Sequence, residues 1–193
     1  VSVHGANRLG TNSLLDLGVF GRRAGQHIGD YVKKVDVPSV SEDVADEAGR
    51  WIHRLTDGQT GPHGGHIMDE MQIAMMEKVG IYRSAKDMQA AVDQIQALLE
   101  RYQQVRAQDT GRAFNTDLLE LIELRNLLDL SLLTAASALN RQESRGAHSR
   151  EDFPDRDDNN WQKHSLAYLN CDTVRIEYRK VDTSIWEPKP RTY

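Results

Sequence analysis

The sequence predicts a mainly α-helical chain, an antiparallel helical bundle followed by a small C-terminal β-hairpin region. In residues 84–107, apolar side chains recur every three or four positions, as they do on one face of a helix; they are Ala85, Met88, Val92, Ile95, Leu99 and Tyr102. Residues 118–139 are more apolar still, which indicates a helix buried among other helices. Residues 173–179 instead alternate apolar and polar side chains, which is typical of a half-exposed strand.

Composition bounds the class of protein. With 193 residues and 39% hydrophobic content, the chain is long enough for a core. Its net charge of -5 argues against a general nucleic-acid binder, because neutralising phosphates requires a basic face. No apolar run approaches the ~18–20 residues that span a bilayer, so membrane association would go through a partner. A single cysteine, Cys171, excludes an internal disulfide.

The first helix is expected to begin within a residue or two of Ser13. Thr11, Asn12 and Ser13 are all N-cap types, and Ser13 and Asp16 have the spacing of a capping box. Arg8 precedes them in a loop of small residues. Because free N–H groups at a helix N-terminus favour an anion and an arginine fork binds carboxylate or phosphate, these residues predict an anion-binding site. An ordinary capped helix beside a surface arginine is the alternative.

The remaining elements are predicted from N-cap residues, which start helices, and from glycine and proline, which interrupt them. The first helix should run to about residue 34, and Pro38 should separate it from a helix that starts at a capping box, Ser39 and Glu42, and runs to about Leu55. Residues 57–65 include five glycines and prolines and predict a loop. A further helix should then run over residues 66–79.

Several polar and sulfur-containing groups allow more than one interpretation. His63 and His66 have no cysteine or carboxylate cluster at metal-site spacing, so loop histidines are favoured over a metal site. Four methionines at helical spacing are expected in the core rather than on a functional surface; they are Met68, Met71, Met75 and Met76. Cys171 is expected to be structural. Arg145, His148 and Arg150 form either a solvated charge cluster or a structural contact that packs the tail on another domain or a partner.

Residues 4–16, HGANRLGTNSLLD, resemble the C-terminal flavin-binding segment of the succinate dehydrogenase/fumarate reductase flavoprotein subunit family. Further stretches resemble later landmarks of that family in the same order. They are MMEKVGIYR at 75–83, ELRNLLD at 123–129, ESRGAHSREDFP at 143–154 and WQKHSLAY at 161–168. The resemblance therefore spans almost the whole chain.

This resemblance implies a site residue by residue. Arg8 matches the family arginine that binds a dicarboxylate, succinate or fumarate, beside the flavin, and is thus the expected substrate-binding and catalytic residue. Ser13 and Leu14 match positions whose backbone contacts FAD, and Asn12 adjoins them. FAD is the expected cofactor, and no metal ligand is expected in this chain.

The resemblance also implies an organisation and a function. Residues 1–37 would end an FAD-binding domain, 38–142 would form the helical bundle, and 143–193 would form a tail with the hairpin. The chain would be the C-terminal part of a subunit that oxidises succinate and passes electrons through an iron-sulfur subunit to quinone, with membrane anchor subunits as indirect partners. It would lie peripherally, on the cytoplasmic face of the inner membrane or the mitochondrial matrix side. Because the family's other catalytic groups lie upstream of the matching region, this chain alone is expected to be inactive.

Two other interpretations stay open. An enzyme resembling L-aspartate oxidase would share a similar flavin segment and an arginine for a dicarboxylate, and a free-standing helical interaction module would have no catalytic part. The dehydrogenase is preferred because residues 161–168 and the strand at 174–178 resemble its tail. The sequence does not specify whether succinate oxidation or fumarate reduction is the physiological direction.

Overall fold

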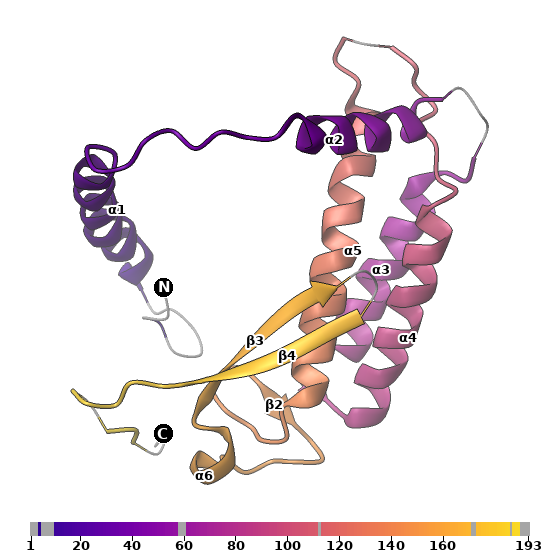
Figure 1. Cartoon of the computed structure of the whole chain (residues 1–193). Helices are drawn as coiled ribbons and strands as arrows, with labels where there is room; N and C mark the ends of the chain where they lie inside the picture. Colours follow the sequence, from indigo (N-terminus) through magenta and orange to yellow (C-terminus); the bar gives the residue numbers. More distant parts are fainter. Residues whose placement is uncertain are drawn as a thin grey trace. The chain divides into compact units, whose positions relative to one another are not determined.

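The computed structural model describes residues 4, 10–57, 61–111, 113–170, 173–185 and 187–189 (Figure 1). Its contacts divide the chain into two compact units, Val1–Arg54 and Leu55–Tyr193. The domain boundaries expected after residues 37 and 142 remain predictions.

The first unit contains α1, Asn12–Tyr31, and most of α2, Glu42–Leu55. The expected start of α1 is confirmed, since the helix begins one residue before Ser13, although it ends at Tyr31 rather than near residue 34. Gly10, just before it, has a φ of 51°, a left-handed conformation that glycine adopts without a steric penalty. Residues 36–41, around Pro38, form neither helix nor strand.

Both capping boxes expected in this unit are wrong. Thr11 is the N-cap of α1 and makes no side-chain cap bond, while Asp16 is bound instead to His4, twelve residues away. At α2 the helix starts later than the Ser39 box requires, and Ser41 Oγ accepts a hydrogen bond from the Asp43 N–H at 3.3 Å. The side-chain spacing was suitable in both helices. At α1, however, His4 binds the carboxylate that the box needs, and at α2 Ser41 caps the helix in place of Ser39.

The second unit is built on a three-helix bundle of α3, Gly64–Lys78, α4, Ala85–Tyr102, and α5, Thr116–Asn140. Consecutive helices run in opposite directions, as Figure 1 shows. This arrangement confirms the antiparallel bundle.

The predicted face of α4 forms much of the bundle core. Four of its six predicted residues are buried, and Ala91 and Leu98 join them; the four are Met88, Ile95, Leu99 and Tyr102. The cap is also as predicted, because Ser84 Oγ accepts a hydrogen bond from the Asp87 N–H at 3.2 Å. The helix ends five residues before the expected Ala107, whose N–H binds the Leu55 carbonyl at 2.8 Å instead of an α4 carbonyl.

The flanking helices differ from the sequence prediction in detail. α3 begins at Gly64, inside the expected loop, where a Cβ would lie 2.3 Å from Leu121 Cδ2; only glycine allows this close approach. α5 buries one face but not its whole circumference, since three of its leucines are exposed: Leu119, Leu127 and Leu130. The expectation of a fully buried helix is therefore wrong for its outer side.

The C-terminal hairpin is confirmed. β3, Lys163–Asn170, pairs antiparallel with β4, Thr173–Lys180, in a register that joins Lys163 to Lys180 and Asn170 to Thr173. The hairpin packs against α5, where the Tyr178 hydroxyl donates to Asn140 Oδ1 at 2.5 Å. Cys171, which is expected to be structural, lies outside the described residues.

A second, very small sheet and a single-turn helix were not predicted. β1, Tyr82–Arg83, pairs in parallel with β2, Ser149–Arg150, and so ties the α3–α4 corner to the segment after α5. α6, Asp158–Trp161, leads into the hairpin. Within the described ranges, no helix combines the length and apolar character needed to cross a membrane.

Candidate functional site

The predicted cofactor residues lie at the beginning of α1. Asn12, Ser13 and Leu14 occupy its first turn. The N–H groups of Leu14 and Leu15 bind the Thr11 carbonyl at 2.9 and 3.4 Å, whereas those of Asn12 and Ser13 have no hydrogen-bond acceptor among the described residues. No acidic residue stands in this turn. The N-terminus of α1 therefore keeps its partial positive charge, which favours an anion.

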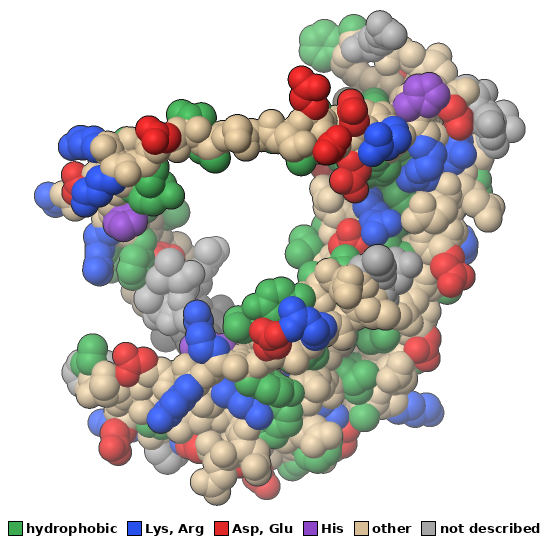
Figure 2. All heavy atoms as spheres, in the orientation of Figure 1, with side chains coloured by type: hydrophobic (Ala, Val, Ile, Leu, Met, Phe, Trp, Pro, Cys, Tyr) green, Lys and Arg blue, Asp and Glu red, His purple; other side chains and the backbone are tan. Residues whose placement is uncertain are grey.

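The neighbouring helix shows the opposite arrangement. α2 carries Glu42 and Asp43 in its first turn and His53 and Arg54 in its last, which is the usual compensation of a helix dipole. Figure 2 shows the acidic side chains gathered over α2. The missing compensation is thus a property of α1 and not of the whole unit.

The carboxylate of Asp16, in α1, is held by a histidine. Asp16 Oδ2 lies 3.1 Å from His4 Nε2, and both side chains are about three-quarters buried. His4 and Asp16 are the first and last residues of the HGANRLGTNSLLD motif, so their contact joins the two ends of the motif. Arg8, the predicted substrate residue between them, lies outside the described residues.

The apolar residues of α1 have little cover. Leu14, Leu15 and Leu17 are 68%, 63% and 70% exposed, and α1 has no buried residue. Exposed leucines in such number usually mark a surface that another part of a protein covers. The expected cofactor residues therefore lie on a helix that has no buried residue in this structure.

The other sequence candidates do not form a second site. His63 is the N-cap of α3, where its Nδ1 accepts the Gly65 N–H at 3.0 Å, and its ring lies edge-on to that of His66. No group of three or more potential ligands for a metal ion occurs among the residues that the structure describes. Met71 is buried as expected, but Met76 is exposed, so the methionine prediction is correct only in part.

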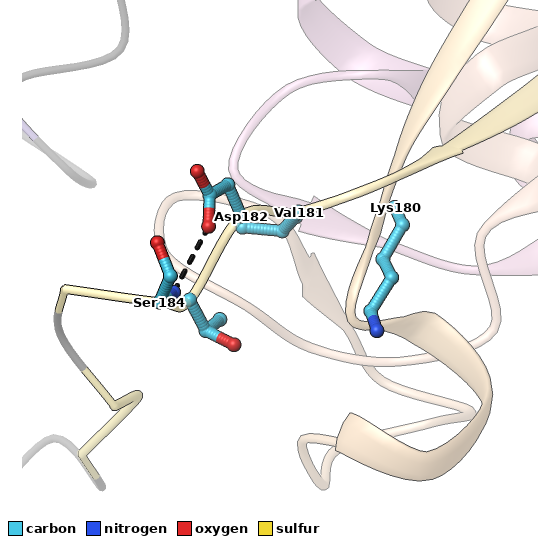
Figure 3. A pocket seen from close by; sticks show the side chains of 5 residues that line it. Lys180, Val181, Asp182 and Ser184 are labelled. Carbon is cyan, nitrogen blue, oxygen red and sulfur yellow. Dashed lines mark hydrogen bonds between the residues drawn. The ribbon is translucent and has the colours of Figure 1, made fainter.

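A shallow hollow lies at the end of β4 (Figure 3). Among the described residues, it is lined by residues 180–184, and Asp182 Oδ1 accepts the Ser184 N–H at 2.9 Å. These residues form one short stretch at the end of β4, so the described lining brings together no side chains from separate elements.

Among the charged residues that follow α5, sequence reasoning singled out Arg145, His148 and Arg150 but missed Glu143. Arg150 is 1% exposed, so the interpretation as a solvated charge cluster is wrong for it, and Glu143 is 0% exposed. Arg141 and Arg145 bind the Glu143 carboxylate at 2.6–3.0 Å, and the Asp157 N–H donates to it at 2.9 Å. Burial opposes ionisation of Glu143, but these hydrogen bonds outweigh it and hold the pKa of Glu143 below its ordinary value.

Comparison with known proteins assigns the family. Residues 68–193 match the family model described as fumarate reductase flavoprotein C-term. The fumarate reductase flavoprotein subunit of Haemophilus influenzae is 41% identical over 196 residues, covering 99% of this chain and 32% of that protein. The succinate dehydrogenase flavoprotein subunit of Coxiella burnetii is 43% identical over 183 residues, covering 94% of this chain and 31% of that protein.

A solved structure agrees over the whole chain. A mutated FrdA chain of E. coli quinol fumarate reductase superposes with a TM-score of 0.92 at 41% identity, covering 100% of this chain and 34% of that one. The chain thus spans about a third of the length of the relatives it matches. It belongs to the succinate dehydrogenase/fumarate reductase flavoprotein family, and it corresponds to the C-terminal region of that family's subunit.

Proposed function

We propose that this chain is the C-terminal part of an FAD-containing subunit that oxidises succinate to fumarate and passes the electrons through an iron-sulfur subunit to quinone. Membership of the succinate dehydrogenase/fumarate reductase family supports this proposal. Because the chain spans about a third of its relatives, the activity belongs to a complete flavoprotein, and this chain alone is expected to be inactive.

The beginning of α1 is the observation that carries the cofactor assignment. Asn12, Ser13 and Leu14 form an N-terminal turn without an acidic residue, and His4 holds the nearest carboxylate, that of Asp16. This turn fits the electron-rich end of a flavin, where reduction adds negative charge. Bound FAD would supply the two-electron acceptor for succinate oxidation.

In this proposal Arg8 binds the substrate. Its guanidinium can grip one succinate carboxylate through two parallel hydrogen bonds, which fixes the direction of the carbon chain as well as its charge. Orientation of this kind lowers the barrier by removing rotational freedom before the reaction. The exposed leucines of α1, Leu14, Leu15 and Leu17, would be covered by the remainder of the flavoprotein.

Fumarate reduction is the second candidate, since relatives named fumarate reductase match this chain as well as those named succinate dehydrogenase. The same residues would hold the substrate in either direction. The complex would lie peripherally, at the cytoplasmic face of the inner membrane or on the mitochondrial matrix side, through membrane anchor subunits.

The test is an assay of the complete FAD-loaded flavoprotein in both directions. Succinate-dependent reduction of a soluble dye is expected, and it should exceed fumarate-dependent oxidation of a reduced dye. The reverse ratio would favour the second candidate. Oxidation of L-aspartate without oxidation of succinate would contradict both and indicate the L-aspartate oxidase-like alternative.

A further inference from the structure

His148 lies half-buried between the end of α5 and the β1–β2 pair. Its Nδ1 is 2.8 Å from Arg83 Nη1, and its Nε2 is 3.4 Å from the Arg141 carbonyl oxygen. A guanidinium has donors only, so Nδ1 must be the acceptor and the ring proton must be on Nε2, facing the carbonyl. The observed contact therefore requires a neutral imidazole.

Arg83 connects this histidine to the end of α3. Its Nε donates to the carbonyls of Val79 and Gly80 at 3.1 and 2.9 Å, and its own carbonyl accepts the Glu151 N–H at 2.9 Å. The side chain thus caps α3 while the backbone pairs with the segment after α5. The hydrogen bond between His148 and Arg83 therefore links the end of α3 to the segment after α5 at one corner of the bundle.

The charged groups that face His148 have one sign. Arg83 approaches from β1, Arg150 from β2 and Arg141 from the end of α5. Arg145 pairs with His148 through its backbone, and its guanidinium binds Glu143 and Asp158. The nearby carboxylates are already engaged, Glu143 by Arg141 and Arg145, and Asp152 by Arg150. No carboxylate among the described residues forms an ion pair with His148. A proton on Nδ1 would lie beside the Arg83 guanidinium, which offers it no acceptor.

We propose that the contact between His148 and Arg83 is an acid-sensitive latch that holds the segment after α5 against the α3–α4 corner. Protonation places a hydrogen on Nδ1, turns the acceptor into a second cation beside Arg83, and ends the hydrogen bond. The β1–β2 pair, only two residues long in each strand, then opens while the bundle core stays folded.

The direction of the pH dependence follows from the ring's surroundings. Burial lowers the pKa of His148; the hydrogen bond to the Arg141 carbonyl opposes this, and Arg83, Arg150 and Arg141 lower it further. An exposed histidine in the opened state has a pKa of about 6.5. The latch is therefore fully closed above about pH 6.5 and weakens as the pH falls from there through the lowered pKa of His148.

Hydrogen exchange followed by mass spectrometry tests this in the complete flavoprotein. After correction for the intrinsic effect of pH, peptides covering residues 79–84 and 148–152 should exchange faster at pH 5.5 than at pH 7.5. The opening constant should rise by at most about tenfold, because pH 5.5 lies one unit below the pKa of an exposed histidine. Peptides from the middle of α4 should keep their protection.

Two variants isolate the ring. His148→Gln cannot titrate and keeps an acceptor for Arg83, so its exchange in these peptides should be independent of pH. His164→Gln, at an exposed position of the hairpin, should behave as the parent. Equal protection of the parent at both pH values, acceleration spread evenly over α4, or the parent's full response in His148→Gln would each overturn the latch. The first two readouts need no variant, so they stand if His148→Gln fails to fold.

Discussion

Arg150 and Asp152 form a two-pronged ion pair that joins the end of α5 to the beginning of α4. Arg150 Nε and Nη2 each lie 2.7 Å from a different oxygen of Asp152. Arg150 Nη1 donates to three carbonyls at the end of α5, the nearest being that of Arg141 at 2.8 Å. Asp152 Oδ2 accepts the Ala85 N–H, the first of α4, at 2.9 Å. One pair of side chains thus satisfies the negative end of one helix and the positive end of another.

Replacing the buried Arg150 with methionine should destabilise the second unit strongly. The change leaves buried carbonyls at the end of α5 without a donor, which costs about 1–3 kcal/mol, and removes the partner of the more exposed Asp152. Urea denaturation of the chain, followed by circular dichroism, measures the loss. Arg179→Met, at an exposed position of the hairpin, is the matched control and should stay within about 0.5 kcal/mol of the parent. Equal effects of the two substitutions would mean that Arg150 has no special role.

The same pair predicts how stability responds to strong acid. The hydrogen bonds from Arg150 lower the pKa of Asp152 to about 2, below its ordinary value of about 3.8. Stability from this pair should therefore be fully present above about pH 4 and be lost as the pH falls through 2. The difference in unfolding free energy between the parent and Asp152→Asn, measured from pH 6 to pH 2, should be constant at first and then shrink. A difference that already shrinks between pH 6 and pH 5 would contradict this assignment.

The sequence predicted the elements whose signals are local. The α4 face has helical spacing and a cap, Ser84, whose partner is three residues away, and the hairpin alternates along a single stretch of chain. The failures involve partners distant in sequence. Asp16 had the spacing of a capping box, but His4 took its carboxylate.

The sequence also failed to predict which charged side chains are buried. Arg150 looked like a solvated residue because charged side chains are rarely buried without partners. Arg150 and Glu143 bind backbone carbonyls, an N–H group and other charged residues that the fold brings together. The spacing of residues in the sequence does not predict these partners. Two-residue strands such as β1 and β2 are likewise too short to show alternation.

For the proposed site, Arg8→Lys in the complete flavoprotein should lose most of its succinate turnover and keep its FAD. Lysine preserves the charge, but an ammonium group cannot reproduce the paired hydrogen bonds of a guanidinium. Steady-state kinetics with succinate, after bound FAD has been quantified, measure the effect. Arg22→Lys, on the exposed surface of α1, controls for the loss of a guanidinium elsewhere in the same unit. A turnover within twofold of the parent would remove Arg8 from the site.

The flavin potential of Ser13→Asp tests the central claim, that the beginning of α1 faces the electron-rich end of the flavin. Ser13 is the second residue of α1, where an acidic side chain is compatible with the helix dipole, so the helix should survive. The new charge should disfavour the reduced flavin and lower its two-electron potential by about 6–43 mV, because helix-end effects are roughly 0.3–2 kcal/mol and 1.4 kcal/mol corresponds to about 30 mV. Ser39→Asp, outside any helix, adds the same charge in the same unit and should leave the potential unchanged. Spectroelectrochemical titration of the fully FAD-loaded flavoprotein should show the decrease in Ser13→Asp alone, and an unchanged or raised potential in that variant would contradict the placement of α1 at the flavin.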